Sequence, residues 1–250
     1  MHRFANPARF LRISALVQPW AVVATVGFFA AGLYYALLSS PPDYQQGETV
    51  RIMYIHVPAA WMALFTYAVV AVASAVALIW KHPLADLAAK AASPIGACFT
   101  LVCLVTGSLW GQPMWGTWWV WDARLTSVLI LFFLYLGHIA LVNAFDDPTR
   151  GARAAAILAL IGSVNLPIIK FSVDWWNTLH QPASVTRLDA PAIDSHMLLP
   201  LLLMAAAFHA YFVVVMLIRL KAEILARKVR ATRLVQGMEQ PLAGVAEGRV

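Results

Sequence analysis

Long apolar runs, separated by short polar segments, dominate the chain. Six of these runs are long enough for a helix to cross a bilayer, which takes about 20 residues. They are continuously apolar, whereas the strands of a membrane barrel alternate between apolar and polar residues. The pattern therefore predicts an all-α membrane protein, a six-transmembrane-helix bundle. The runs lie near residues 19–39, 57–80, 92–110, 126–144, 154–171 and 196–219.

Composition agrees with a membrane protein. Of the 250 residues, 61% are hydrophobic and only 12% are charged, against about 25% charged residues in soluble domains. The first apolar run is longer than the core of a signal peptide and has no clear small-residue cleavage site, so we expect it to be retained.

Lysine and arginine are divided unequally between the two ends of such a bundle. An even number of spans places both termini on one side, and that side holds fourteen of the 18 basic residues. Cytoplasmic connections carry the excess of lysine and arginine, so both termini are predicted to be cytoplasmic. The net charge of +6 then reflects topology, and it gives no support to nucleic-acid binding. The four basic residues on the other side are Arg51, Arg124, Lys170 and Arg187.

The polar segments contain no separate soluble domain. Residues 1–220 are predicted to form the six-helix domain, with periplasmic loops at about 40–56, 110–125 and 171–195. Residues 221–250 form a basic cytoplasmic C-terminal tail that begins as a helix. Contact of this tail with anionic membrane lipid is its simplest interpretation. The sequence has no Walker A motif, so the chain cannot hydrolyse ATP by itself.

The second outer loop is rich in tryptophan. Five tryptophans occur in the thirteen residues WGQPMWGTWWVWD at 110–122, and the glycines and proline among them disfavour an ordinary helix. An aromatic surface of this kind suits a large planar ligand with a polar edge, and a porphyrin fits best. The residues concerned are Trp110, Trp115, Trp118, Trp119 and Trp121, followed by Asp122.

Two histidines are candidate axial ligands of a haem iron. His56 lies where the second span begins, with Pro58 in the first turn of that helix, and His180 lies in the third outer loop. The topology places both beside the tryptophans, so two imidazoles could bind the iron from opposite sides. His196, at the outer start of the sixth span, remains an alternative as the second ligand or as a donor behind it.

Three further polar residues have two interpretations each, and one proline has a structural interpretation. Arg51 and Arg124 could bind haem propionates through their guanidinium groups, or they could reach phospholipid headgroups. Asp122 is expected to cap the fourth span and also to shape the haem site. Pro167 is expected to kink the fifth span.

The remaining histidines and both cysteines are poorer candidates. His2 and His82 are expected to face the cytoplasm, and His138 and His209 fall within spans, where a buried polar partner is the default expectation. Cys98 and Cys103 match neither a CxxC pair nor the CxxCH of covalent haem attachment. We expect both cysteines to act as small packing residues.

Several motifs together resemble a known family. The segment WGQPMWGTWWVWDARLTS at 110–127 is similar to the WWD signature of haem-handling proteins of cytochrome c biogenesis. RIMYIHVPAA at 51–60, AFDD at 144–147 and NLPIIKFSVDWWNTLHQ at 165–181 resemble one branch, the CcmC family of the System I maturation pathway. The resemblance covers most of residues 41–181 and is weak at the N-terminus and after the sixth span.

The resemblance implies a function and a set of site residues. It implies a protein of the bacterial inner membrane that binds non-covalent haem b and presents it at the periplasmic face to the haem chaperone CcmE. It also implies CcmD, a small membrane protein, and the ABC transporter subunits CcmA and CcmB as partners. Axial ligation is implied for His56 and His180. Haem contact is implied for Trp110, Trp115, Trp118, Trp119, Trp121 and Asp122, and a part in haem delivery for Arg51 and Arg124.

Two other functions are alternatives to haem transport. A haem lyase that joins haem to apocytochrome c resembles the larger WWD proteins, which have additional spans and more histidines. A membrane redox protein with haem b and quinone would need haems stacked across the bilayer, and only His138 and His209 lie inside it. We therefore expect a transport protein and not an enzyme.

Overall fold

The computed structural model describes residues 6–187 and 189–247. In this part of the chain no strand forms, and six helical segments are long and apolar enough to cross a membrane. The predicted six-helix all-α architecture is confirmed. The segments are Pro7–Ser39, Glu48–Trp80, Ala85–Trp115, Ala123–Asn143, Pro148–Trp175 and Ser195–Arg233.

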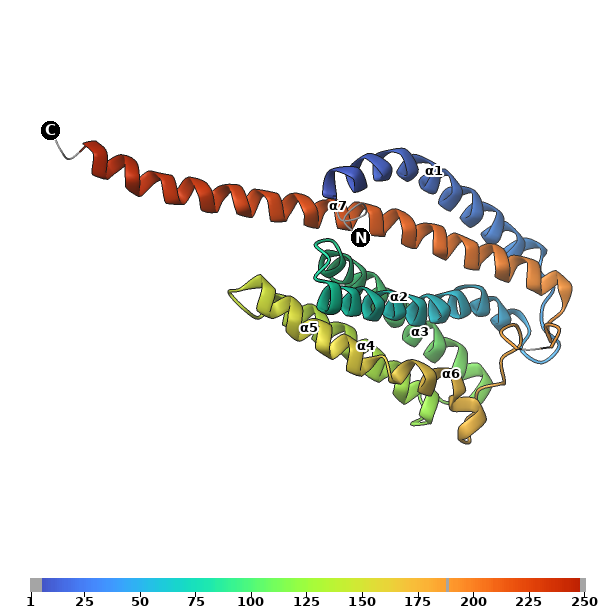
Figure 1. Cartoon of the computed structure of the whole chain (residues 1–250). Helices are drawn as coiled ribbons and strands as arrows, with labels where there is room; N and C mark the ends of the chain where they lie inside the picture. The colour runs from blue at the N-terminus through green and yellow to red at the C-terminus, as the bar shows by residue number, and fades with distance from the viewer. Residues whose placement is uncertain (1–5, 188, 248–250) are drawn as a thin grey trace.

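Helices follow one another through short connections (Figure 1). A π-helical turn, η2, extends the first helix, and a 3-10 turn, η3, leads into the second. The elements in chain order are α1 (Pro7–Tyr34), η2 (Tyr35–Ser39), η3 (Glu48–Ile52), α2 (Met53–Trp80), α3 (Ala85–Trp115), α4 (Ala123–Asn143), α5 (Pro148–Gly162), α6 (Asn165–Trp175) and α7 (Ser195–Glu247).

Local sequence signals explain where several helices begin. Asn6, Asp122 and Asp147 each accept a hydrogen bond from a backbone N–H in the first turn of α1, α4 and α5, as N-cap residues do. The expected cap on the fourth span is confirmed, with a distance of 2.7 Å from the Leu125 nitrogen to Asp122 Oδ1.

Two outer segments are more helical than the sequence indicated. The first part of the tryptophan segment, Trp110 to Trp115, continues α3 although Pro113 lies within it. The helix ends at Gly116, whose φ of 72° is the left-handed conformation that glycine adopts readily. Likewise α2 begins at Met53, so His56 lies on a helix and Pro58 is inside that helix. The expectation of a non-helical backbone in the tryptophan segment is therefore wrong for residues 110–115 and confirmed for residues 116–122.

Pro167 interrupts the helix of the fifth span, whereas only a kink was expected. The fifth span is divided into α5 and α6, with the break at Ser163 and Val164. Proline has no N–H to bond the carbonyl four residues earlier, which here is that of Ser163, and its ring collides with that carbonyl. The Ser163 carbonyl instead accepts the Leu166 N–H at 3.1 Å.

The spans form two groups. α1 packs mainly against α7, and α2 against α3, while α4 lies between α3 and the α5–α6 pair. Connections 40–47, 116–122 and 176–194 gather at one end, here called the histidine end (Figure 1). Connections 81–84 and 144–147 lie at the opposite end together with the start of α1, here called the basic end.

α7 continues far past the basic end as one helix of 53 residues (Figure 1), a length of about 80 Å. Hydrogen bonds and ion pairs from side chains of α7 to α3 fix the direction of α7. Arg219 Nε donates to the Ala91 carbonyl at 2.9 Å, Lys90 pairs with Glu223 at 2.8 Å, and Arg227 pairs with Asp86. The structure thus extends the tail in line with α7. Of the fourteen basic residues predicted on the cytoplasmic side, Arg3 and Arg249 lie outside the described residues.

Candidate functional site

His56 is held at the interface of α2 and α3. Its Nδ1 lies 3.1 Å from the Cys103 carbonyl oxygen and 3.1 Å from Thr106 Oγ1. The carbonyl can only accept, so Nδ1 carries the proton in this arrangement. Nε2 is then the unprotonated nitrogen, with a lone pair available to a metal.

One face of α3 is shaped around the His56 ring. Cys103, Gly107 and Trp110 recur at helical spacing on this face. A Cβ atom at Gly107 would lie only 2.9 Å from Cε1 of His56, so glycine is required for the ring to approach. The Trp110 ring meets the imidazole edge to face, with centroids 5.7 Å apart, and its Nε1 donates to Gln46 Oε1 at 2.8 Å.

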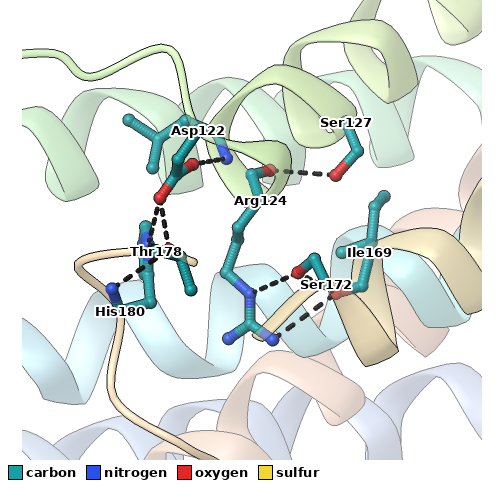
Figure 2. Close-up of polar contacts among 8 residues, drawn as sticks. Asp122, Arg124, Ser127, Ile169, Ser172, Thr178 and His180 are labelled. Atoms are coloured by element: carbon teal, nitrogen blue, oxygen red, sulfur yellow. Dashed lines mark hydrogen bonds and ion pairs between the residues drawn. The ribbon is translucent and has the colours of Figure 1, made fainter. Parts of the chain in front are cut away.

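His180 is held by a carboxylate, in the connection between α6 and α7 (Figure 2). Its Nδ1 lies 3.3 Å from Asp122 Oδ2 and 3.2 Å from Thr178 Oγ1. Thr178 Oγ1 also donates to the same carboxylate oxygen. Asp122 therefore caps α4 with Oδ1 and orients the imidazole with Oδ2. The Trp115 ring lies edge to face on His180, with centroids 4.9 Å apart.

Burial and hydrogen bonds shift the pKa values of this pair. Burial alone would raise the pKa of Asp122, but the bonds from Thr178 and the Leu125 N–H and the nearby imidazole outweigh it, so the pKa is lowered. Burial lowers the pKa of His180, and Arg124 adds to this, although Asp122 acts in the opposite direction. The imidazole is thus neutral at neutral pH, the form that binds metals.

The imidazoles of His56 and His180 share the same pattern of hydrogen bonding. Each has Nδ1 engaged, and within residues 6–187 and 189–247 neither Nε2 has a hydrogen-bond partner. His56 and His180 lie close enough to interact electrostatically. An imidazole whose far nitrogen donates to a carbonyl or carboxylate is the usual form of a protein metal ligand. Two such ligands are the number that a six-coordinate haem iron takes from a protein.

The five tryptophans differ in what they contact and in how far they are exposed. Trp110 and Trp115 contact the two histidines as described, and Trp119 packs against Trp121 with centroids 5.5 Å apart. Trp118 and Trp121 are 58% and 75% exposed. Trp119 Nε1 is buried without a partner among the described residues, which is unfavourable unless a ligand supplies an acceptor. A porphyrin with carboxylate side chains has acceptors of that kind, so the residues fit the expected ligand.

Both candidate arginines bond to backbone carbonyls. Arg51 Nη1 donates to the Ala36 carbonyl at 2.6 Å, and its Nε pairs with Glu48 at 2.5 Å. Arg124 Nε donates to Ser172 Oγ at 3.0 Å, and its Nη2 reaches the Ile169 carbonyl at 3.4 Å (Figure 2). Arg51 thus attaches the first outer loop to η2, and Arg124 attaches α4 to α6.

His196 differs from the other two outer histidines. Its side chain is 79% exposed, against 21% for His180, and its Nδ1 lies 3.1 Å from Asp194 Oδ1 in its own segment. No aromatic contact joins it to a tryptophan among the described residues. Elsewhere, His138 is buried with Nδ1 2.8 Å from Ser93 Oγ, the buried polar partner that was expected.

Several supporting residues were not found from the sequence. Thr106, Gly107, Thr178 and Gln46 all contact a histidine or tryptophan of the site. The spacing of Cys103, Gly107 and Trp110 was a usable signal, since these residues share a helix face. Nothing local indicated Gln46, which lies 64 residues from Trp110.

The fold and site define a class: a polytopic membrane protein with a pair of half-buried imidazoles and a tryptophan-rich segment at one end. Residues 1–235 match the family described as heme exporter protein C, and the chain belongs to this family. It is 60% identical over 232 residues to heme exporter protein C of Bradyrhizobium diazoefficiens, covering 93% of this chain and 88% of that one.

Two other relatives extend the comparison. The chain is 53% identical over 201 residues to heme exporter protein C of Escherichia coli strain K12, covering 80% of this chain and 81% of the relative. It is 52% identical over 179 residues to a putative cytochrome c biosynthesis ccmC-like mitochondrial protein of Marchantia polymorpha, covering 72% and 75%. The resemblance recognised in the sequence is confirmed.

Proposed function

We propose that this protein binds haem b at the histidine end and exports it for cytochrome c biogenesis. Nε2 of His56 and Nε2 of His180 would be the two axial ligands of the iron. The relatives named heme exporter protein C and the cytochrome c biosynthesis protein support this role. Haem is the cargo of the protein, bound without covalent attachment.

The observation that carries the proposal is the common state of the two imidazoles. Both have Nδ1 committed to an acceptor and an Nε2 with no partner among the described residues, and they come from elements 124 positions apart in the chain. His180 also contacts Trp115 and interacts with His56, whereas His196 does neither within the described residues. This favours His180 over His196 as the second ligand.

The orientation in the membrane follows from charge. The connections and helix ends at the basic end hold most of the lysine and arginine, which favours the cytoplasm for that end. The histidine end then faces the periplasm of the bacterial inner membrane. Delivery to the haem chaperone CcmE is proposed from this face, with CcmD and the ABC transporter subunits CcmA and CcmB as partners in the membrane.

An exporter must release its cargo. The exposed rings of Trp118 and Trp121 and the connection that carries His180 lie at the protein surface. A porphyrin held there keeps one edge open to a second protein. The tryptophan rings would contribute apolar and stacking contact.

An absorption spectrum of the full-length protein in detergent, oxidised and reduced, tests the proposal. Wild type should show the bands of low-spin haem b with two nitrogen ligands. His56→Ala and His180→Ala should each lose the low-spin form, and the double variant should lose haem. His196→Ala is the matched control, and its spectrum should equal that of wild type.

Two results would overturn the proposal. If wild type neither carries haem nor takes up added haemin, the site is not a haem site. If His196→Ala loses the low-spin bands while His180→Ala keeps them, the assignment of the second ligand is wrong.

A further inference from the structure

An apolar groove lies between the two groups of spans, near the basic end and away from His56 and His180. It has a volume of about 580 Å³ and is lined by α1, α2, α3, α7 and the α2–α3 connection. Six of its lining residues share one face of α2, at the spacing of a helix stripe. They are Phe65, Ala68, Val69, Val72, Ala73 and Val76.

The groove opens toward the lipid side of the bundle. Phe65 and Val72 are exposed large apolar residues, within a span that is apolar enough to lie in the membrane. From Phe65 to Val76 the helix rises about 16 Å. One leaflet of a bilayer contributes about 15 Å of hydrocarbon. The groove therefore runs from mid-membrane to the basic end and has the depth of one leaflet, which suits an acyl chain and is too short for a spanning helix.

The end of the groove is lined by three residues that have basic neighbours in the chain. Phe10 lies between Arg9 and Arg12, His82 follows Lys81, and Leu220 precedes Lys221. These neighbours come from α1, the α2–α3 connection and α7.

Basic residues next to a cavity between spans attract anionic headgroups. We propose that this groove is a binding site for an anionic phospholipid of the leaflet at the basic end. One acyl chain lies along the α2 face, and the phosphate is bound by the basic neighbours. The site is independent of the haem site, since it lies at the other end of α2.

Native mass spectrometry of the full-length protein in detergent measures the binding. The probes are phosphatidylglycerol and phosphatidylcholine with identical acyl chains. The expected result is a clear preference for phosphatidylglycerol. The double variant Lys81→Asn/Lys221→Gln should weaken its binding about thirtyfold, about fivefold per charge lost. Asparagine is chosen at residue 81 because Lys81 has a φ of 50°, a conformation that asparagine tolerates.

A matched control separates the groove from general charge. Arg150→Gln/Arg153→Gln removes the same charge from α5, which does not line the groove, and should leave the binding unchanged. Val72→Trp fills the mouth of the groove from an exposed position and should also abolish binding, whereas the charge variants keep the apolar packing intact.

Three results would overturn the proposal. Phosphatidylcholine could bind as tightly as phosphatidylglycerol, the control pair could weaken binding as much as the Lys81 and Lys221 variant, or added haemin could displace the lipid from the groove. The last result would make the groove a haem site. Haem spectra of all these variants should equal that of wild type, which keeps this test separate from that of the proposed function.

Discussion

The imidazoles of His56 and His180 are held in place by different parts of the structure. His56 stands on a helix, between α2 and α3, and bonds to a backbone carbonyl and a hydroxyl of α3. His180 stands on a connection without regular structure and bonds to the carboxylate of Asp122 and the hydroxyl of Thr178. One support is packing between two long helices, and the other is a small set of side-chain hydrogen bonds.

The two rings therefore differ in how freely they can move and in how basic they are as metal ligands. The His56 ring packs against Gly107 between two helices, and packed helices resist displacement. A ring on a connection can move when a few hydrogen bonds break. The carboxylate behind His180, however, makes that imidazole the more basic ligand when it binds a metal. If the two histidines hold haem as proposed, the helix side would fix its position, and the loop side would combine strong ligation with the capacity to release it.

Crowding the helix side should have the largest effect. Gly107→Val places atoms where even a Cβ would lie 2.9 Å from the His56 ring, so the ring must leave its position. We expect loss of the low-spin haem spectrum and a loss of stability of about 1–3 kcal/mol. Absorption spectra and thermal unfolding measure the two effects.

The matched control for this change is Gly27→Ala in α1, where an added Cβ meets nothing within 4 Å. That variant should keep the wild-type spectrum and gain roughly 0.5–1 kcal/mol of stability. A normal low-spin spectrum in Gly107→Val would contradict the packing account of His56.

Removing the charge on the loop side should have the next largest effect. Asp122→Asn preserves the cap of α4, since asparagine caps as well as aspartate, but it removes the carboxylate from His180. We expect haem affinity to fall about 10–100-fold, as measured by titration with haemin, and the reduction potential of the bound haem to rise.

Asp147→Asn provides the same substitution at a cap without an imidazole, since among the described residues the Asp147 carboxylate accepts from the Thr149 N–H at 2.8 Å and pairs with Arg150, but contacts no histidine. Its haem affinity should match wild type. Equal losses in the two variants would mean that haem affinity falls whenever a cap loses its negative charge, and that the contact between Asp122 and His180 is not the cause.

A smaller effect is expected for Thr106→Val. The hydroxyl is lost, but the Cys103 carbonyl still accepts from His56 Nδ1. Losing one neutral hydrogen bond costs about 1 kcal/mol, so haem affinity should fall about fivefold. Thr25→Val removes a similar hydroxyl that bonds the Ala21 carbonyl in α1 and should change nothing. A loss as large as that of Asp122→Asn would show that the two supports are equivalent.

The smallest effect is expected from pH. Burial lowers the pKa of His180, so less than half of this ring is protonated at about pH 6.5, where an exposed imidazole would be half protonated. The midpoint of the decline in haem uptake should therefore lie below about pH 6.5. A half-transition at or above about pH 6.5 would indicate an exposed second ligand.

Much of the fold was present in the sequence in local form. Continuous apolar runs predicted the six spans, because the bilayer sets a minimum length for each. Asp122 predicted the start of α4, and Pro167 predicted that the helix of the fifth span is disturbed. These signals act within a few residues, so no tertiary contact is needed to interpret them. The family was equally accessible, since its motifs are contiguous.

The tertiary structure alone decided how the site is held. That Nδ1 of His56 bonds to α3, 47 residues away, and that Nδ1 of His180 bonds to Asp122, 58 residues back, depends on how the spans pack. The same packing extends α3 through Trp115 and turns Arg51 and Arg124 toward backbone carbonyls. Periodicity assigns a residue to a helix face, but the partner of that face is set by side-chain fit between segments distant in the chain.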